Sequence, residues 1–496
     1  MAWEACDRWA ENDPDRVAVI DATGDAPRSI SFATLRTMAD GLARHLAGRN
    51  IGWGDRVGVL RSQHPWTAAA HLAIWKLGAI SIPLFTLFGP DALSVRLQDA
   101  GASAVLTDPE GAARLTELGL GPAIVPESLT LNAAPFATAE TGPEDPAVLI
   151  YTSGTTGPPK GALHGHRVLR GHLPGVEMSH NLLPQNGDCL WTPADWAWIG
   201  GLFDVLMPGL YHGVPVVAAR LPKFTGAAAA DIIQRCGVRN VFFPPTALRR
   251  LRADGTRIAG LRSVASGGEP LGAEMLAYGQ EAFGLTINEF YGQTECNMCV
   301  SSCADQFPNR PGFMGKAVPG FEVAVLEPGA DGVGDIAVRR GAASMMLGYW
   351  NRPDATAAKF RGDWMLTGDR GAMAGDDIRF VGRDDDVITS AGYRIGPSEI
   401  EDCLITHPAV NSAGVVGRPD PERTERICAF VVLAEGYDAT PLLRQDLKAH
   451  VKERLAAHEY PRDIFCVAAL PMTVTGKIKR GELRQWALEM SDDQTA

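Results

Sequence analysis

The sequence lacks a long uninterrupted apolar run. Its most apolar stretch, residues 68–88, is broken by Lys76, Gly78 and Pro83. A buried helix that leads into a strand is therefore favoured over a membrane span, which needs about 20 apolar residues. The first residues, MAWEACDRWAENDPDR, are charged from the start and contain no apolar segment of the kind found in secretory signals. We expect a cytoplasmic protein with no stable membrane insertion.

Positive charge and cysteine are also scarce. The chain has 46 Lys+Arg against 58 Asp+Glu, a formal net charge of −12, which argues against a nucleic acid as partner. Nine cysteines scattered over 496 residues fit a reducing compartment better than a disulfide framework. Cys296, Cys299 and Cys303 are close together, but three thiols without a fourth ligand nearby make an incomplete metal site. The composition is compatible with a monomer or a homo-oligomer.

Short β-branched runs alternate with helical stretches over most of the chain. Strands are expected at residues 17–20, 56–60, 104–107, 147–151, 214–218 and 241–243. This alternation predicts an α/β fold with helix-covered parallel sheets. From about residue 315 the strands become shorter and alternate in polarity, which predicts a β-rich subdomain. After residue 388 we expect a helix at 398–406, a strand at 427–433, a helix at 441–456 and a strand at 464–468.

A loop rich in glycine and hydroxyl residues follows the expected strand at 147–151. Residues 151–161 read YTSGTTGPPKG. Backbone N–H groups, hydroxyls and a lysine in this density suit a loop that surrounds phosphate oxygens. A plain surface turn needs far fewer glycines and hydroxyls. The loop does not fit the pattern G-x-x-x-x-G-K-[ST], so a P-loop nucleoside triphosphatase is disfavoured.

This loop and six segments after it resemble the adenylate-forming (AMP-binding) superfamily. The likeness is to its acyl-CoA synthetase branch, and within that branch to the medium-chain enzymes. The order and spacing of the segments cover nearly the whole chain. They are SGGEP at 266–270, NEFYGQTE at 288–295, WMLTGD at 364–369, FVGRDDD at 380–386, SAGYRIG at 390–396 and PMTVTGK at 471–477.

The resemblance implies a large N-terminal domain (1–384, with the β-rich subdomain at about 315–384), a hinge at Asp385 and a small mobile α+β C-terminal domain (386–496). It implies Lys477 as the catalytic residue, bridging the carboxylate and the α-phosphate, where positive charge is needed. Glu295 would bind Mg²⁺, which prefers oxygen ligands, and Asp369 the ribose. The implied ATP-binding residues are Thr152, Ser153, Gly154, Thr155, Thr156, Gly157, Lys160, Glu289, Phe290, Tyr291, Gly292, Gln293, Thr294, Asp369, Arg383 and Arg394.

Without the resemblance, Lys477 would be read as a solvent lysine in a basic run. His164 and His166, just after the loop, are expected to be structural. For coenzyme A, the resemblance implies a strand lining the thiol tunnel and separate contacts to the nucleotide, which favours coenzyme A over a carrier protein as acceptor. These residues are Ala391, Gly392, Tyr393, Arg423, Tyr460, Pro461 and Arg462.

The acyl pocket is implied at Trp196, Gly267, Gly268 and Gly292. Acetyl-specific members carry a tryptophan at the position of Gly292, so glycine here is expected to leave room for a larger acid. Trp196 and Trp198 are explained equally well by core packing.

The sequence therefore predicts an ATP-dependent acyl-CoA synthetase acting on a medium-chain or ring-containing acid larger than acetate. It would form acyl-CoA, AMP and pyrophosphate through acyl-AMP, with ATP, Mg²⁺ and coenzyme A. The alternatives are an adenylating enzyme that loads a carrier protein, and a non-catalytic nucleotide and acyl binding protein. The pattern at 471–477 further implies a lysine acetyltransferase that modifies Lys477.

Overall fold

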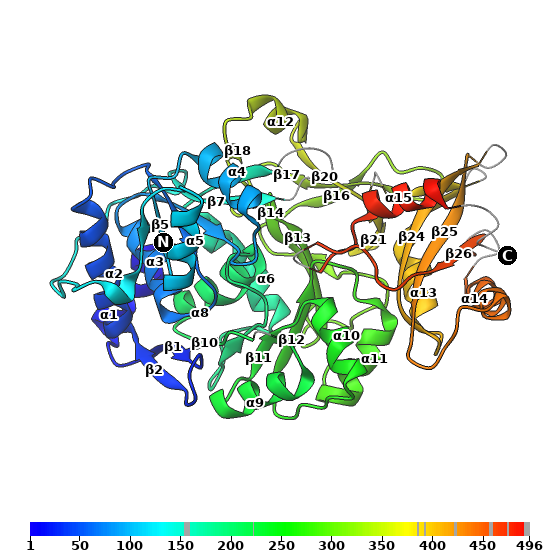
Figure 1. Ribbon diagram of the computed structural model, residues 1–496, viewed down its shortest axis with the longest axis horizontal. Helices are drawn as coiled ribbons and strands as arrows, with labels where there is room; N and C mark the ends of the chain where they lie inside the picture. Colours follow the sequence, from blue (N-terminus) through cyan, green and yellow to red (C-terminus); the bar gives the residue numbers. More distant parts are fainter. Residues whose placement is uncertain are drawn as a thin grey trace.

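The computed structural model describes residues 1–152, 159–221, 223–383, 386–390, 393–420, 424–455, 460–473 and 476–490. The described strands form four sheets. Two large sheets and their helices make up the N-terminal part of the molecule, and the last sheet lies at the opposite end from α1 and α2 (Figure 1). The boundary expected at residue 385 falls outside the described residues.

The largest sheet has nine strands in the order β15-β14-β13-β12-β11-β9-β10-β1-β2. Its central strands β13, β12, β11, β9, β10 and β1 are mutually parallel, and the strands at both edges are antiparallel. The bounds are β1 Val17–Asp21, β2 Arg28–Ser31, β9 Leu190–Trp191, β10 Val216–Ala218, β11 Asn240–Phe242, β12 Ser263–Gly267, β13 Asn288–Gln293, β14 Cys296–Ser301 and β15 Lys316–Ala317.

The second sheet has seven strands in the order β18-β8-β7-β4-β3-β5-β6. The run from β7 to β6 is parallel, whereas β8 and β18 are antiparallel to their neighbours. The bounds are β3 Arg56–Leu60, β4 Ile80–Leu84, β5 Ala104–Thr107, β6 Ala123–Ile124, β7 Pro146–Thr152, β8 Lys160–Gly165 and β18 Gly348–Tyr349.

Helices cover both sheets. The main core joins the two sheets through α2, α3, α6 and α8, with Val19, Val59 and Trp75 among its members. A second core packs α9 to α11 on the nine-stranded sheet, and a third packs α4 and α5 on the seven-stranded sheet. The bounds are α1 Arg8–Asn12, α2 Phe32–Ala47, α3 Pro65–Lys76, α4 Pro90–Ala100, α5 Pro109–Glu117, α6 Val168–Ser179, α7 Ile199–Gly201, α8 Met207–His212, α9 Gly226–Cys236, α10 Pro245–Ala253 and α11 Gly272–Phe283, with short π-helices η1 Trp3–Asp7 and η3 Leu202–Leu206 and a 3-10 helix η2 Pro126–Ser128.

The third and fourth sheets follow along the chain. The third is an antiparallel sheet in which β21 pairs with β20, and the fourth pairs two long strands, β24 and β25, with β26 added in parallel. Their bounds are β16 Val323–Leu326, β17 Gly334–Arg339, β19 Phe360–Arg361, β20 Trp364–Ala374 and β21 Asp377–Arg383, with α12 Pro353–Ala358; then β22 Ile388–Ser390, β23 Tyr393–Ile395, β24 Val410–Asp420, β25 Thr424–Leu433 and β26 Asp463–Cys466, with α13 Pro397–Ile405, α14 Pro441–Arg454 and α15 Arg480–Glu489.

This architecture confirms the predicted fold class. The strands at 56–60 and 104–107 have the predicted bounds, and the apolar stretch at 68–88 contains the buried helix α3 followed by β4. In the described part of the chain, no helix is long and apolar enough to cross a membrane. The fourth sheet contains one long strand, β24, that the sequence analysis did not anticipate.

Candidate active site

A cavity of about 1830 Å³ opens between the nine-stranded sheet, the β20–β21 hairpin and the segment that leads into α15. Thr246, Gly268 and Gln293, which line it, lie just beyond or at the carboxyl ends of the parallel strands β11, β12 and β13. Crevices at the carboxyl ends of parallel strands are the usual ligand sites of open α/β sheets. The position of the cavity therefore favours a ligand site.

Strand β13 and the turn after it form one wall. Residues from Glu289 through Glu295 all line the cavity. Alternate strand residues normally point to opposite faces, but the register with β14 shifts between Tyr291 and Gln293. Such an irregularity in the strand allows consecutive residues to face the same cavity. Glu289 is buried, and burial raises the pKa of its carboxyl to about 8.

Asp369 is held between an aromatic hydroxyl and a guanidinium. The Tyr291 hydroxyl donates to Asp369 Oδ2 at 2.5 Å, and Arg383 Nε lies 3.6 Å from Asp369 Oδ1. Asp369 and Arg383 face each other because β20 and β21 pair at these two positions. Burial raises the pKa of Asp369, and Arg383 opposes that rise. Near them, Gln293 Nε2 donates to the Thr367 carbonyl at 3.0 Å.

Glu295 lies at the end of the β13–β14 turn with only 8% of its surface exposed. The Tyr349 hydroxyl donates to Glu295 Oε1 at 2.5 Å, and Lys160 Nζ lies 5.4 Å from the Tyr349 ring centroid. Among the described residues no group of three or more His, Cys, Asp or Glu side chains is arranged to hold a metal. A single carboxylate fits Mg²⁺, which commonly keeps waters and substrate phosphates as its other ligands.

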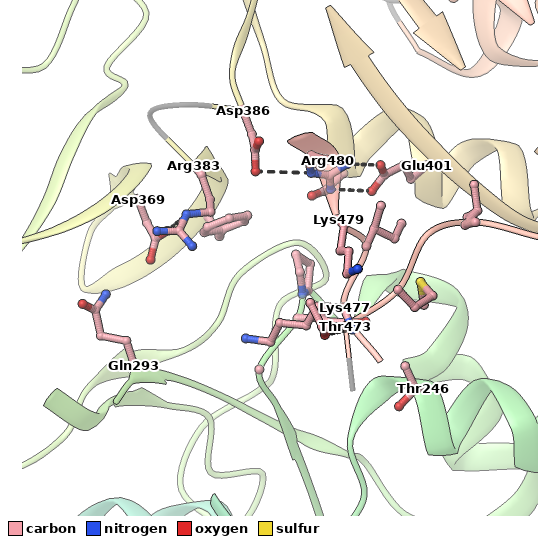
Figure 2. Close-up of a pocket in the computed structure, with 18 of the residues that line it drawn as sticks. Thr246, Gln293, Asp369, Arg383, Asp386, Glu401, Thr473, Lys477, Lys479 and Arg480 are labelled. Atoms are coloured by element: carbon pink, nitrogen blue, oxygen red, sulfur yellow. Dashed lines mark hydrogen bonds and ion pairs between the residues drawn. The ribbon is translucent and has the colours of Figure 1, made fainter. Parts of the chain in front are cut away.

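Lys477 reaches the cavity from the opposite side. Its backbone N–H donates to Thr473 Oγ1 at 3.0 Å, and its carbonyl accepts from Thr473 N at 2.7 Å. Gly476 between them has φ +83°, a left-handed conformation, and packs against Thr246. Figure 2 shows the Lys477 side chain pointing into the cavity, toward the wall that carries Gln293. Burial within the cavity lowers the pKa of Lys477, while the nearby carboxylates of Glu269 and Asp369 oppose that effect.

A charged cluster anchors the segment behind Lys477. Arg480 pairs with Glu401, with Nη2 donating to Oε2 at 2.8 Å, and its Nε lies 3.3 Å from Asp386 Oδ2. Figure 2 shows Arg480 between these two carboxylates. Arg484 also pairs with Asp386. The first turns of α15 are thus tied to α13 and to the chain that follows the expected hinge.

The structure brings most of the described candidate residues to this one cavity. They come from six separate stretches of the sequence. They are Thr152, Lys160, Gly268, Glu289, Phe290, Tyr291, Gly292, Gln293, Thr294, Glu295, Asp369, Arg383 and Lys477. Sequence reasoning missed Tyr349 and Lys359, which also line it. No motif marks these two, because their position depends on how distant segments pack.

Other candidates lie outside the described residues or away from the cavity. Ser153, Gly154, Thr155, Thr156, Gly157, Asp385, Ala391, Gly392 and Arg423 are not described, and Tyr393 and Arg394 are described only as backbone in β23. Tyr460, Pro461 and Arg462 directly precede β26 and do not line the cavity; the Arg462 guanidinium lies 5.2 Å from the Tyr460 ring centroid.

Two of the four acyl-pocket candidates line the cavity and two do not. Gly268 and Gly292 line the cavity, whereas Trp196 is fully buried in the main core and Gly267 is covered by Phe290. Trp198, two residues after Trp196, lines the cavity instead. A Cβ built on Gly292 would collide with Asn297, so the space beside this glycine is already occupied.

His164 and His166 are buried and do not line the cavity, in agreement with a structural role. Burial lowers the pKa of His164 to about 4, and its Nε2 lies 2.8 Å from the Thr294 carbonyl. Cys296 and Cys299 are residues of β14 and are packed in the core, where Cys299 Sγ donates to the Cys296 carbonyl at 3.1 Å.

The fold is that of adenylate-forming enzymes, as comparison with solved structures shows. The chain superposes on the acyl-CoA synthetase of Brucella canis with a TM-score of 0.73 at 36% identity, covering 98% of this chain and 94% of that one. It superposes on the anthranilate CoA ligase AuaEII in complex with anthranoyl-AMP with a TM-score of 0.85 at 28% identity, covering 97% of each chain.

Sequence comparison then gives the family. Residues 6–350 match the AMP-binding enzyme family and residues 399–477 match the AMP-binding enzyme C-terminal domain. The chain belongs to the AMP-binding enzyme family. It is also 32% identical to the acetyl-coenzyme A synthetase of Bacillus subtilis (strain 168), over 99% of this chain and 91% of that protein.

Proposed function

We propose that this protein is an ATP-dependent acyl-CoA ligase that converts a carboxylic acid, ATP and coenzyme A to acyl-CoA, AMP and pyrophosphate through acyl-AMP. The observation that carries this proposal is the meeting of Lys477, from the segment before α15, with Glu295 and Asp369 across a single cavity. The relatives named above are CoA ligases or acyl-CoA synthetases, which supports the same reaction.

In the first step, the acid's carboxylate attacks the α-phosphate of ATP and pyrophosphate leaves. Both reactants are anions, so the step needs positive charge at the developing transition state. Lys477 supplies it, because its side chain points into the cavity. Glu295, with Tyr349 fixing one of its oxygens, would hold Mg²⁺, which when bound would neutralise phosphate charge.

Asp369 is proposed to accept hydrogen bonds from the ribose hydroxyls. The Tyr291 hydroxyl and Arg383 fix its carboxylate before the nucleotide arrives. Arg383 and Lys160 add positive charge near the phosphates, and the YTSGTTGPPKG loop and Arg394 are proposed to contribute further contacts.

The second step needs a thiol to reach the acyl-AMP. We propose that the C-terminal domain (386–496) rotates about Asp385, so that Ala391, Gly392 and Tyr393 line the thiol tunnel. Arg423, Tyr460, Pro461 and Arg462 would contact coenzyme A. Tyr460, Pro461 and Arg462 do not line the cavity, which supports a role for them only after rotation.

The proposed substrate is a medium-chain or ring-containing acid larger than acetate. The aromatic side chains Trp198 and Phe290 line the cavity and give it an apolar wall. The solved anthranilate CoA ligase handles an aromatic acid, which supports the ring-containing class. Because Asn297 fills the space beside Gly292, this glycine alone does not set the size of the pocket.

The test is to measure pyrophosphate and AMP with a panel of C2 to C10 and aromatic acids, with and without coenzyme A. We expect acyl-CoA and AMP to form together and to require both the acid and coenzyme A. AMP release that ignores coenzyme A would favour loading of a carrier protein. No pyrophosphate with any acid would favour a non-catalytic binding protein.

We also propose that acetylation of Lys477 switches the first step off, because it removes the charge that the step needs. Incubation with a lysine acetyltransferase and acetyl-CoA, followed by mass spectrometry, tests this; an unmodified Lys477 would contradict it. A cytoplasmic location is proposed from the nine free cysteines, which suit a reducing compartment.

A further inference from the structure

A buried carboxyl group in the cavity wall has no role in the reaction proposed above. Asp204 lies on η3 with 1% of its surface exposed, yet it lines the cavity. Gly200, four residues earlier in the same helical segment, lines the cavity too. Residues four apart share one side of a helix, so this side of the segment faces the ligand space.

The carboxyl group of Asp204 has one side-chain partner among the described residues. Asn297 Nδ2 donates to it, at 2.8 Å from Oδ1 and 3.1 Å from Oδ2. An ionised carboxyl group offers about four acceptor positions on its two oxygens, and a protonated one offers fewer together with an O–H donor, so in either form part of this capacity is unused. Burial raises the pKa of Asp204 well above its ordinary value. A carboxyl buried with so little compensation costs stability, and such groups are found where function requires them.

Asn297 presents a second polar atom in the same place. It also lines the cavity, and 4% of its surface is exposed. Its Oδ1 stands where a Cβ on Gly292 would lie, so glycine at 292 makes room for this amide. Within the described part of the chain, no hydrogen-bond donor contacts Asn297 Oδ1. Asp204 and Asn297 thus form a polar pair with spare acceptor atoms, which we call the 204–297 pair.

The surroundings of the 204–297 pair are apolar. Trp198, Ile199 and Phe290 line the same cavity. The ring centroids of Trp198 and Phe242 lie 5.6 Å apart, and those of Phe242 and Phe290 lie 5.1 Å apart. This packing fixes the aromatic wall. A mostly apolar pocket with a few fixed polar groups is the arrangement that orients a ligand and sets specificity.

We propose that the 204–297 pair selects carboxylic acids that carry a hydroxyl or amino group remote from the carboxylate that reacts. The inference rests on the proposed acyl-CoA ligase function and specifies its substrate class. A hydroxyl or amino hydrogen would use the free acceptor positions of Asp204 and Asn297. A purely hydrocarbon acid would displace solvent from the pair and leave both oxygens unpaired, which is costly in a dry pocket.

The test compares matched acids with the purified full-length protein, ATP, Mg²⁺ and coenzyme A. Benzoate is compared with hydroxybenzoates and aminobenzoates, and hexanoate with 6-hydroxyhexanoate and 6-aminohexanoate. We expect the best donor-bearing acid of at least one series to exceed its bare parent by roughly tenfold or more in kcat/KM. Equal or better use of the bare parents in both series would overturn the inference while leaving the proposed function intact.

Two variants test whether Asp204 causes the preference for donor-bearing acids. Asp204→Leu removes the polar group, so the ratio of donor-bearing to bare acid should fall and the bare acid should gain. Asp204→Asn keeps the shape and one acceptor oxygen and should retain part of the preference for hydroxyl acids. The matched control is Asp195→Asn, at a carboxyl that accepts from Ala197 N at 2.8 Å and does not line the cavity. This control should leave the ratio unchanged.

The ratio of two acids on one enzyme does not change when stability or the amount of active protein changes. A merely structural Asp204 would therefore lower both rates together and leave the ratio as it is, which would overturn the inference. If Asp204→Leu fails to fold, the wild-type ratios and Asp204→Asn still decide. No pyrophosphate from any acid would instead overturn the proposed function, and this inference with it.

Discussion

The two sides of the cavity are built differently. The side formed by β13 and β20 is fixed by side-chain hydrogen bonds between separate sheets: the Tyr291 hydroxyl donates to Asp369, and the Tyr349 hydroxyl donates to Glu295. The side that carries Lys477 is a short turn in which the Lys477 N–H donates to Thr473 Oγ1, and the Arg480 cluster lies behind it. The side proposed to bind the nucleotide is therefore held in place by the strands around it, whereas Lys477, the proposed catalytic residue, lies on a turn between β26 and α15.

This difference predicts that the two sides of the cavity act in different steps of the proposed reaction. A wall that binds the nucleotide in both steps must keep its shape, because the adenylate stays bound between them. A lysine needed only in the first step is best placed on a part that moves away for the second. Changes on the Lys477 side should therefore affect one half-reaction, and changes on the β13–β20 side should affect both.

The largest expected effect comes from Lys477→Ala. Loss of a charge aimed at the transition state should lower the rate of acyl-AMP formation by roughly 100- to 1000-fold. Thioester formation from supplied acyl-AMP should change much less. The two half-reactions are measured separately, by ATP–pyrophosphate exchange and by acyl-CoA formation. Lys479→Ala is the matched control, because this lysine pairs with Glu482 at 2.8 Å; equal loss in both half-reactions of Lys477→Ala would contradict the division.

Glu295→Gln is expected to act next most strongly. The amide keeps the size of the side chain but removes the charge that suits Mg²⁺. The Mg²⁺ concentration for half-maximal activity should rise by roughly 10- to 100-fold. Tyr349→Phe, which removes the hydroxyl that fixes Glu295 Oε1, should shift it in the same direction but less. An unchanged Mg²⁺ dependence in Glu295→Gln would exclude Glu295 as the metal ligand.

The sequence predicted the fold well where apolar runs are short and bounded. β3 and β5 begin and end at the expected residues because both are buried parallel strands with clear polar flanks. β24 was missed because glycines, a serine and a proline interrupt its pattern. Its long antiparallel pairing with β25 compensates for these residues, and that pairing is invisible in a local pattern.

The site residues likewise fall into those that a local motif predicts and those whose position depends on distant contacts. Residues within motifs, such as Asp369 and Lys477, were found because the motif names them. Trp198 was not preferred over Trp196, because the sequence does not show which of the two rings lines the cavity and which is buried in the main core. The contact between Asp204 and Asn297 joins positions 93 residues apart, and only the folded chain reveals it.

Asp369→Asn tests the β13–β20 side and should have a moderate effect. The amide replaces one acceptor oxygen with a donor and removes the charge that Arg383 faces. KM for ATP should rise by about tenfold with a smaller change in kcat, because a hydrogen bond to a charged group is lost. Binding of AMP, measured by calorimetry, should weaken by a similar factor. A fall in kcat alone, with nucleotide binding intact, would place Asp369 outside the ribose site.

The smallest expected effect is a difference in pH dependence between the two half-reactions. Burial lowers the pKa of Lys477 below that of an ordinary lysine, which is about 10.4. The first step needs the charged form, which is complete below this lowered pKa and is lost as the pH rises through it. Acyl-AMP formation should therefore decline at a lower pH than an exposed lysine would allow. Thioester formation from supplied acyl-AMP should lack this decline, because Lys477 does not act in that step.

Glu289, whose pKa is raised to about 8, is present in both half-reactions, so comparing the two pH profiles removes its contribution. Lys477→Arg should move the decline to higher pH even if its rate is lower, because a guanidinium stays charged throughout this range. Identical profiles in both half-reactions would show that the two sides of the cavity do not divide the chemistry between them.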